Sequence, residues 1–84
     1  MLSLIDRIGA EMLEFLLRPG NPAVGKRIMD LNLRKGILIA IIKRGGKYLV
    51  PGGAEVLLEG DVISVFAMAE MMPEAMRFFK VDQA

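Results

Sequence analysis

The chain has 84 residues, of which 54% are hydrophobic, and its eleven basic and ten acidic residues leave a formal net charge of +1. A single core in so short a chain barely offsets the conformational entropy of folding. Cysteine and histidine are absent, which excludes a disulfide framework and a zinc site built from those ligands. We therefore expect a homodimer, in which a second copy supplies further stability. The balanced charge creates no field that would attract a polyanion, so we expect no nucleic acid as a partner.

The first seventeen residues carry apolar side chains at nearly helical spacing, which favours one amphipathic helix that ends at Leu17. Gly9 weakens this interpretation, because glycine is unfavourable in the interior of a helix. The segment that follows is easier to interpret. Two prolines and a glycine between Arg18 and Pro22 exclude regular structure, so a loop is predicted there.

The central third of the chain predicts a short helix and then a β-hairpin. A helical stretch over Lys26–Leu31 places its apolar residues on one face, toward a sheet. Leu38–Ile42 is an apolar, β-branched strand, and Lys47–Val50 returns after a turn at Gly45-Gly46, where glycine permits positive φ. Pro51 then ends the second strand, because proline cannot donate to a sheet ladder.

The last third predicts one more strand and a C-terminal helix. Gly60 makes a turn into a strand over Asp61–Ala67, which is rich in Val, Ile and Phe. Pro73 suits the first turn of a helix, where its missing N–H is not needed. Three residues of this helix would form its buried stripe: Met72, Met76 and Phe79.

These elements predict an α+β fold: a small, mostly antiparallel sheet of about four strands, with a short crossover helix and a C-terminal helix on one side. No repeat or linker divides the sequence, so residues 1–84 should form one domain. The apolar run that begins at Ile37 is cut off by Lys43-Arg44 and is too short to cross a membrane. Asp6 and Arg7 interrupt the N-terminal segment, which does not resemble a signal peptide. We expect a cytoplasmic protein.

The residues that carry catalysis in most enzymes are scarce. Histidine and cysteine are missing and only two serines are present, so we expect no enzyme and no catalytic residue. Glu55, Glu59 and Asp61 could in principle bind a divalent ion together. Glu55 and Glu59 lie in a predicted loop, however, so we interpret them as solvated carboxylates, and we expect Asp61 to fix the turn into the last strand. We expect no metal site. The glycine pairs lack the strand and helix context of a nucleotide-binding loop.

Five short motifs occur in a fixed order along the chain, and together they are more specific than any one of them. They are PAVGK at 22–26, DL at 30–31, IIKRG at 41–45, VPGG at 50–53 and LEGDV at 58–62. This series resembles the TrkA-C family, the C-terminal ligand-sensing (RCK C-terminal) half of potassium-conductance regulators. The resemblance covers residues 12–79, which leaves residues 1–11 as an N-terminal extension.

The resemblance implies a first strand over Glu11–Arg18, in place of a continuous helix. We accordingly expect a short helix over Ser3–Ile8 and a strand from Met12. Alternate residues of that strand would face the core: Leu13, Phe15 and Leu17. The resemblance also implies a homodimer and, as partner, a membrane cation channel or transporter, either in the same chain or as a separate subunit. Such a partner would hold the domain at the inner face of the membrane.

Several TrkA-C relatives bind cyclic di-adenosine monophosphate, and the resemblance implies four ligand-facing residues: Leu33, Arg34, Ile37 and Pro51. Their alternative roles are dimer core for the three apolar residues and a surface charge for Arg34. At Leu38 we expect a polar side chain in the ligand-binding relatives, so this chain differs from them there. Two functions remain open: a ligand-sensing module that controls potassium or other cation transport, and a purely structural dimerisation domain without a ligand.

Overall fold

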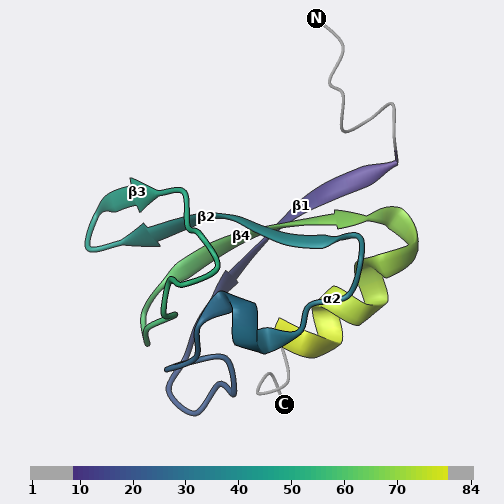
Figure 1. Ribbon diagram of the computed structural model, residues 1–84. Coiled ribbons are helices and arrows are strands. Elements are labelled where there is room, and N and C mark those ends of the chain that lie inside the picture. The colour runs from purple at the N-terminus through teal and green to yellow at the C-terminus, as the bar shows by residue number, and fades with distance from the viewer. Residues whose placement is uncertain (1–8, 80–84) are drawn as a thin grey trace, which may run out of the picture.

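The computed structural model describes residues 9–79, and they form one four-stranded sheet with helical segments on one of its faces (Figure 1). The strand order is β1-β4-β2-β3, and every neighbouring pair is antiparallel. The elements in chain order are β1 (Ala10–Leu16), η1 (Ile28–Leu31), β2 (Ile37–Arg44), β3 (Lys47–Leu49), β4 (Val62–Met68), η2 (Ala69–Met71) and α2 (Met72–Phe79). The predicted α+β class is confirmed. The expected helix over Ser3–Ile8 lies outside the described residues.

The helix predicted over Lys26–Leu31 is shorter than expected. Only Ile28–Leu31 is helical, as one 3₁₀ turn, and it ends at Asn32 in the left-handed conformation, with φ of 54°. Arg27 is extended and forms an isolated antiparallel bridge with Val56. The backbone of this segment therefore hydrogen-bonds to the connection before β4 and is not available to a longer helix.

The hairpin between β2 and β3 forms where it was predicted. Gly45 has φ of 57° and Gly46 has φ of 77°, so both residues of the two-residue turn are left-handed. This is the primed turn that matches the twist of a hairpin. The hairpin is short, because β3 pairs only with the last part of β2, from Ile42 to Arg44.

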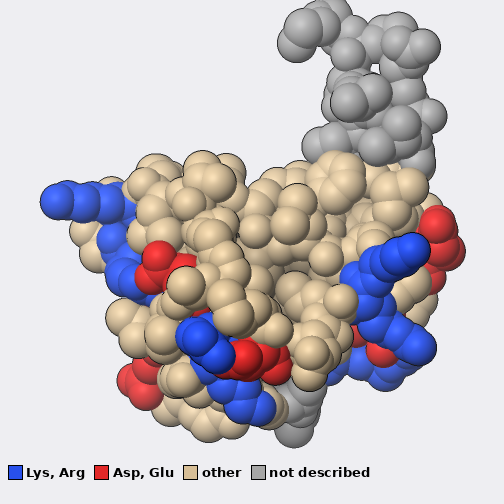
Figure 2. All heavy atoms as spheres, in the orientation of Figure 1, with Lys and Arg blue, Asp and Glu red and all other residues tan. Residues whose placement is uncertain are grey.

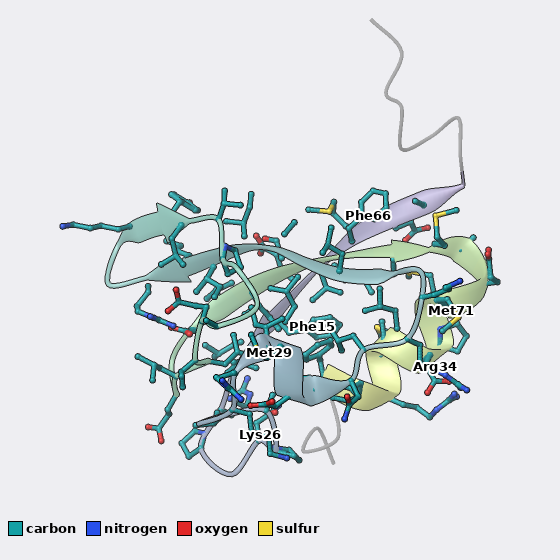
Figure 3. The ribbon with its side chains drawn as sticks, in the orientation of Figure 1. Phe15, Lys26, Met29, Arg34, Phe66 and Met71 are labelled. Carbon is teal, nitrogen blue, oxygen red and sulfur yellow. The ribbon has the colours of Figure 1, made fainter. Side chains whose placement is uncertain are left out.

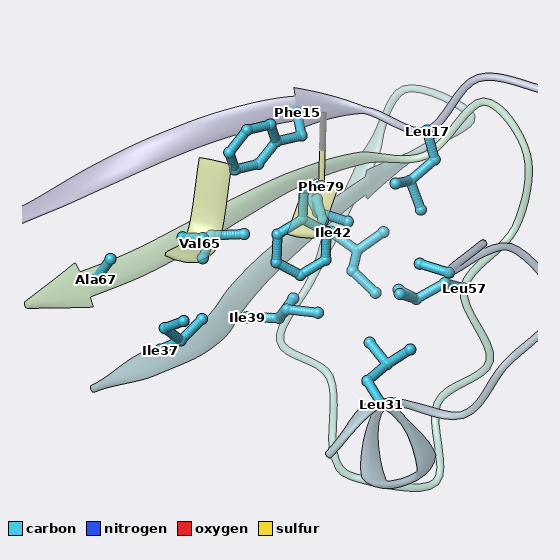
Figure 4. Packing of buried hydrophobic residues seen from close by; sticks show 13 residues of the cluster. Phe15, Leu17, Leu31, Ile37, Ile39, Ile42, Leu57, Val65, Ala67 and Phe79 are labelled. Carbon is cyan, nitrogen blue, oxygen red and sulfur yellow. The ribbon is translucent and has the colours of Figure 1, made fainter. Parts of the chain in front are cut away.

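The core fills the space between the sheet and the helical segments (Figure 4). Alternate residues of β4 are fully buried: Ile63, Val65 and Ala67. The ring of Phe79, in α2, packs against Phe15, in β1, with 5.3 Å between ring centroids. Of the three residues predicted as the stripe of this helix, Phe79 is buried, whereas Met72 and Met76 are partly buried against the core.

A β-bulge changes which residues of β2 face the core. Ile39 pairs with Val65, but the next β4 residue, Ser64, pairs with Ile41, so Ala40 is an extra residue in β2. The alternation of the strand shifts by one at that point. Ile39 and Ile42 are both buried in the core as a result, whereas Ile41 belongs to the opposite face.

Candidate ligand-binding region

Three of the four expected ligand-facing residues lie together at the beginning of β2. Leu33 and Arg34 lie in the loop between η1 and β2, and Ile37 is the first residue of the strand. The backbone carbonyl of Arg34 accepts a hydrogen bond from the Ile37 N–H at 3.2 Å. Pro51 lies elsewhere in sequence, two residues after the end of β3, in the connection whose Gly53 carbonyl accepts a hydrogen bond from the Met29 N–H.

These four side chains differ in their access to solvent. Ile37 is buried in the core at 9% exposure, and Leu33 is half-buried against the same core. Pro51 is half-buried as well. The Arg34 side chain, in contrast, is 69% exposed. Arg34 is therefore the most exposed member of the set, and it can reach a ligand without any change in the packing of the core.

The guanidinium of Arg34 belongs to a small charged cluster with α2. The Glu74 carboxylate oxygen Oε1 lies 3.7 Å from Arg34 Nη1 and 2.9 Å from Arg77 Nη2. One carboxylate thus faces two guanidinium groups, and the exposed Lys35 adds a further positive charge in the same loop. Figure 2 shows basic side chains gathered at the right of the molecule, the end at which Figure 3 labels Arg34. Exposed ion pairs contribute about 0–1 kcal/mol, so Arg34 can exchange Glu74 for another anion.

The sequence did not reveal a second charged cluster, centred on Arg44. This guanidinium binds Asp61 through Nε and Nη2 at 2.8 and 2.7 Å, and its Nη1 lies 3.1 Å from Glu55 Oε2. Asp61 is 1% exposed, so its carboxylate is buried within this cluster. Its expected role in the turn is confirmed, because Oδ2 accepts a hydrogen bond from the Leu58 N–H at 2.9 Å. Arg44 and Asp61 both stand in the motifs noted above, but nothing local in the sequence pairs them.

The two partners of this cluster hold each other in the charged form. Burial by itself would raise the pKa of the Asp61 carboxyl, but hydrogen bonds from Arg44 and from the Leu58 N–H outweigh it and lower that pKa below its usual value. The hydrogen bond to Asp61 in turn raises the pKa of Arg44. Within residues 9–79, no three acidic side chains lie close enough together to hold a metal ion. In the same range, no helix is long and apolar enough to cross a bilayer.

Solved structures with this fold include RCK domains in complex with a ligand. The RCK_C domain dimer of S. agalactiae BusR in complex with c-di-AMP has a TM-score of 0.69 and 26% identity, over 83% of this chain and 96% of that one. A structure of an RCK domain with the ligand abbreviated cda has a TM-score of 0.62 over 81% of this chain, at 21% identity. The latter shows similarity of fold alone.

A further structure corrects one expectation from the sequence. S. agalactiae BusR in complex with its busA-promoter DNA has a TM-score of 0.72 and 23% identity, over 96% of this chain and 42% of the BusR chain. The expectation that nucleic acid is excluded as a partner was therefore wrong, because this fold occurs in a chain that is bound to DNA. The net charge of one domain does not restrict the partners of a longer protein that contains it.

Curated relatives show the family. A Trk system potassium uptake protein TrkA homolog of Methanosarcina mazei is 32% identical over 79 residues, and TrkA of Azorhizobium caulinodans is 33% identical over 80 residues. Both alignments cover at least 94% of this chain, which spans only 18% and 17% of the length of those proteins. Residues 12–80 match the model of the TrkA-C domain, and the chain belongs to the TrkA-C domain family.

Proposed function

We propose that this domain regulates the transport of potassium or another cation by sensing a small anionic ligand. The proposal is supported by the family and by the TrkA potassium uptake proteins that match most of the chain. The domain would act in the cytoplasm, at the inner face of the membrane, where a channel or transporter is its partner. Two copies would form the functional unit, as in the solved RCK_C domain dimer of BusR.

The proposed ligand is a cyclic dinucleotide, with cyclic di-adenosine monophosphate as the first candidate. The single observation that carries this choice is the likeness to the BusR domain dimer, which contains that ligand. The chemistry at the beginning of β2 is compatible with it. Arg34 offers a planar guanidinium for a phosphate, and the half-buried Leu33 and Pro51 offer apolar surface for a base.

Isothermal titration calorimetry with cyclic di-adenosine monophosphate tests this function. A two-fold dimer and a symmetric dinucleotide should give one ligand per two chains. Arg34→Ala should weaken binding at least tenfold, and Arg34→Lys should weaken it less, because an ammonium cannot form the two parallel hydrogen bonds of a guanidinium.

Arg77→Ala is the matched control for this experiment. The Arg77 side chain is 69% exposed, as is that of Arg34, and both guanidiniums contact the same Glu74 oxygen. Each of the two alanine variants therefore removes one of the guanidinium groups that neutralise the Glu74 carboxylate. Only Arg34→Ala also removes the proposed contact with the phosphate. Equal affinity for the two variants would place the site elsewhere. Absence of binding heat for the wild-type domain at millimolar ligand would favour the structural dimerisation domain instead.

A further inference from the structure

Methionine is concentrated in one short segment of the chain. The sequence has seven methionines and no cysteine, and four of the seven stand between residues 68 and 76: Met68, Met71, Met72 and Met76. They belong to the end of β4, to η2 and to α2. All four are half-buried, so each keeps part of its surface in contact with solvent. In a chain without cysteine, the methionine thioethers are the groups that a peroxide oxidises most readily.

Two of these side chains lie tightly against Gly36. A Cβ placed on this glycine would lie 3.0 Å from Met71 Cγ and 3.3 Å from Met68 Cγ, which is closer than side chains normally pack. Gly36 also has φ of 87°, a conformation that residues with a side chain rarely adopt. Glycine is therefore required at this position for two reasons, the backbone conformation and the close approach of two thioether side chains.

Gly36 belongs to a tight turn that begins at Arg34. The Ile37 N–H donates to the Arg34 carbonyl oxygen at 3.2 Å and closes a β-turn, in which Gly36 has the third position. Positive φ at that position is typical of a type II turn. The Met68 N–H donates to the Gly36 carbonyl oxygen at 2.8 Å and joins the turn to the end of β4. Figure 3 labels Met71 and Arg34 at the same end of the molecule. The Met71 side chain thus packs directly on the turn that carries Arg34.

We propose that Met71 is an oxidation site, and that its conversion to the sulfoxide by a peroxide opens the turn from Arg34 to Ile37. In this reaction the sulfur is oxidised by two electrons and forms a bond to one peroxide oxygen, while the O–O bond breaks. With hydrogen peroxide, the second oxygen leaves as water together with both hydrogen atoms. The product side chain is larger than the thioether, and it is polar.

The position of Met71 is unfavourable for a sulfoxide. Its side chain packs against the hydrophobic core as well as against Gly36, and a polar oxygen held in such a contact loses hydrogen bonds to water. Rotation of the side chain toward solvent restores those hydrogen bonds but removes the packing on Gly36. The hydrogen bonds donated by the Ile37 and Met68 amides are then less protected from water. The inference goes beyond the proposed function, since it requires no ligand.

Hydrogen exchange at these two amides measures the opening of the turn. The full chain is treated with hydrogen peroxide, mass spectrometry of peptides quantifies the oxidation of each methionine, and NMR follows exchange at the Ile37 and Met68 amides. Oxidation of Met71 should accelerate exchange at both amides at least tenfold. Unchanged exchange in a protein with fully oxidised Met71 would overturn the proposal. So would a Met71 that stays reduced while Met72 and Met76 are oxidised.

Met71→Leu and Met72→Leu are matched variants for this experiment. Leucine keeps the apolar character and nearly the volume of methionine but has no sulfur. Both methionines are partly buried against the core, whereas Met72 is not among the side chains nearest to Gly36. Peroxide should accelerate exchange less than twofold in Met71→Leu and at least tenfold in Met72→Leu. Equal acceleration in the two variants would assign the effect to another methionine and refute the role of Met71.

Enzymatic reduction provides the final test. Methionine sulfoxide reductases remove the sulfoxide oxygen as water, while two thiols supply the electrons and join in a disulfide. Treatment of the oxidised wild type with these enzymes and a thiol should return exchange at both amides to within twofold of the untreated protein. Fast exchange that persists after Met71 is reduced again would show that the turn opened for another reason. Because no dinucleotide is present, failure of this test and failure of the ligand proposal remain distinguishable.

Discussion

Arg44 holds Asp61 by two parallel hydrogen bonds, Nε to Oδ1 at 2.8 Å and Nη2 to Oδ2 at 2.7 Å. This pair joins the end of β2 to the turn that enters β4. The same guanidinium donates to the backbone carbonyl of Val56 at 2.9 Å and to Glu55 at 3.1 Å. One side chain at the end of β2 thus contacts three residues of the long connection between β3 and β4.

We expect Arg44→Ala to destabilise the domain strongly. Asp61 is almost fully buried, and the substitution would leave its carboxylate without a charged partner. Removal of one partner of a buried ion pair costs about 3–5 kcal/mol. Small domains are stable by only about 5–15 kcal/mol. The urea concentration at the midpoint of unfolding should therefore be much lower in Arg44→Ala than in the wild type, or the variant should be unfolded without urea.

Arg27→Ala is the control for this prediction. Arg27 and Asp30 form a pair of the same chemistry at 2.7 Å, but their side chains are 52% and 48% exposed. Loss of an exposed pair should cost no more than about 1 kcal/mol. Equal changes in the free energy of unfolding for the two variants would contradict the importance of burial at Asp61.

The same ion pair predicts a loss of stability in acid. The pKa of Asp61 is lower in the folded chain than its ordinary value, so the folded state favours the carboxylate. Its contribution is complete above the unfolded pKa, about 3.9, and is lost as the pH falls through the lower folded pKa. Urea denaturation at pH 7 and in steps below pH 4 should show this loss in the wild type. In Asp61→Asn the loss should be smaller, and an equal loss in both proteins would assign it to other carboxylates.

The fold was predictable from the sequence wherever the signals were local. The glycine pair at Gly45-Gly46 specified the hairpin turn, and Pro73 marked the first turn of the C-terminal helix. The bulge at Ala40 was not predictable, because the run from Ile37 to Ile42 is apolar throughout and offers no alternation that would distinguish two faces. Pairing with β4, far along the chain, decides which of these residues enters the core.

The candidate site was predictable only in part, for a similar reason. The exposure of Arg34 agrees with either role assigned to it from the sequence, and Ile37 proved to be a core residue. The contact between Arg34 and Glu74 depends on where α2 packs, which no local pattern encodes. The exposure of Leu38 depends on sheet register, and register is set by long-range pairing.

Substitution of Asn21 should loosen the attachment of α2. The buried Asn21 side chain donates from Nδ2 to the Phe79 carbonyl oxygen at 3.2 Å and accepts from the Ala23 N–H at 2.9 Å. Asn21→Ala removes both bonds and should cost about 1–3 kcal/mol in the free energy of unfolding. Asn21→Asp keeps the acceptor for Ala23 but places a carboxylate against the carbonyl of Phe79. It should therefore be destabilising as well, and wild-type stability in Asn21→Asp would show that the bond to Phe79 contributes nothing.

The hairpin turn gives a final test of the fold. Gly45 and Gly46 have φ of 57° and 77°, a region in which a β-branched side chain is strained, although a Cβ at either position would have no neighbour within 4 Å. Gly45→Val and Gly46→Val should each cost about 1–2 kcal/mol, which corresponds to roughly 4–8 °C in Tm per kcal/mol for a domain of this size. Gly52→Val is the control, because Gly52 also has open space around it but is not in the left-handed region. Thermal denaturation should place the Tm of both turn variants clearly below that of Gly52→Val, and three equal midpoints would show that backbone strain does not govern this turn.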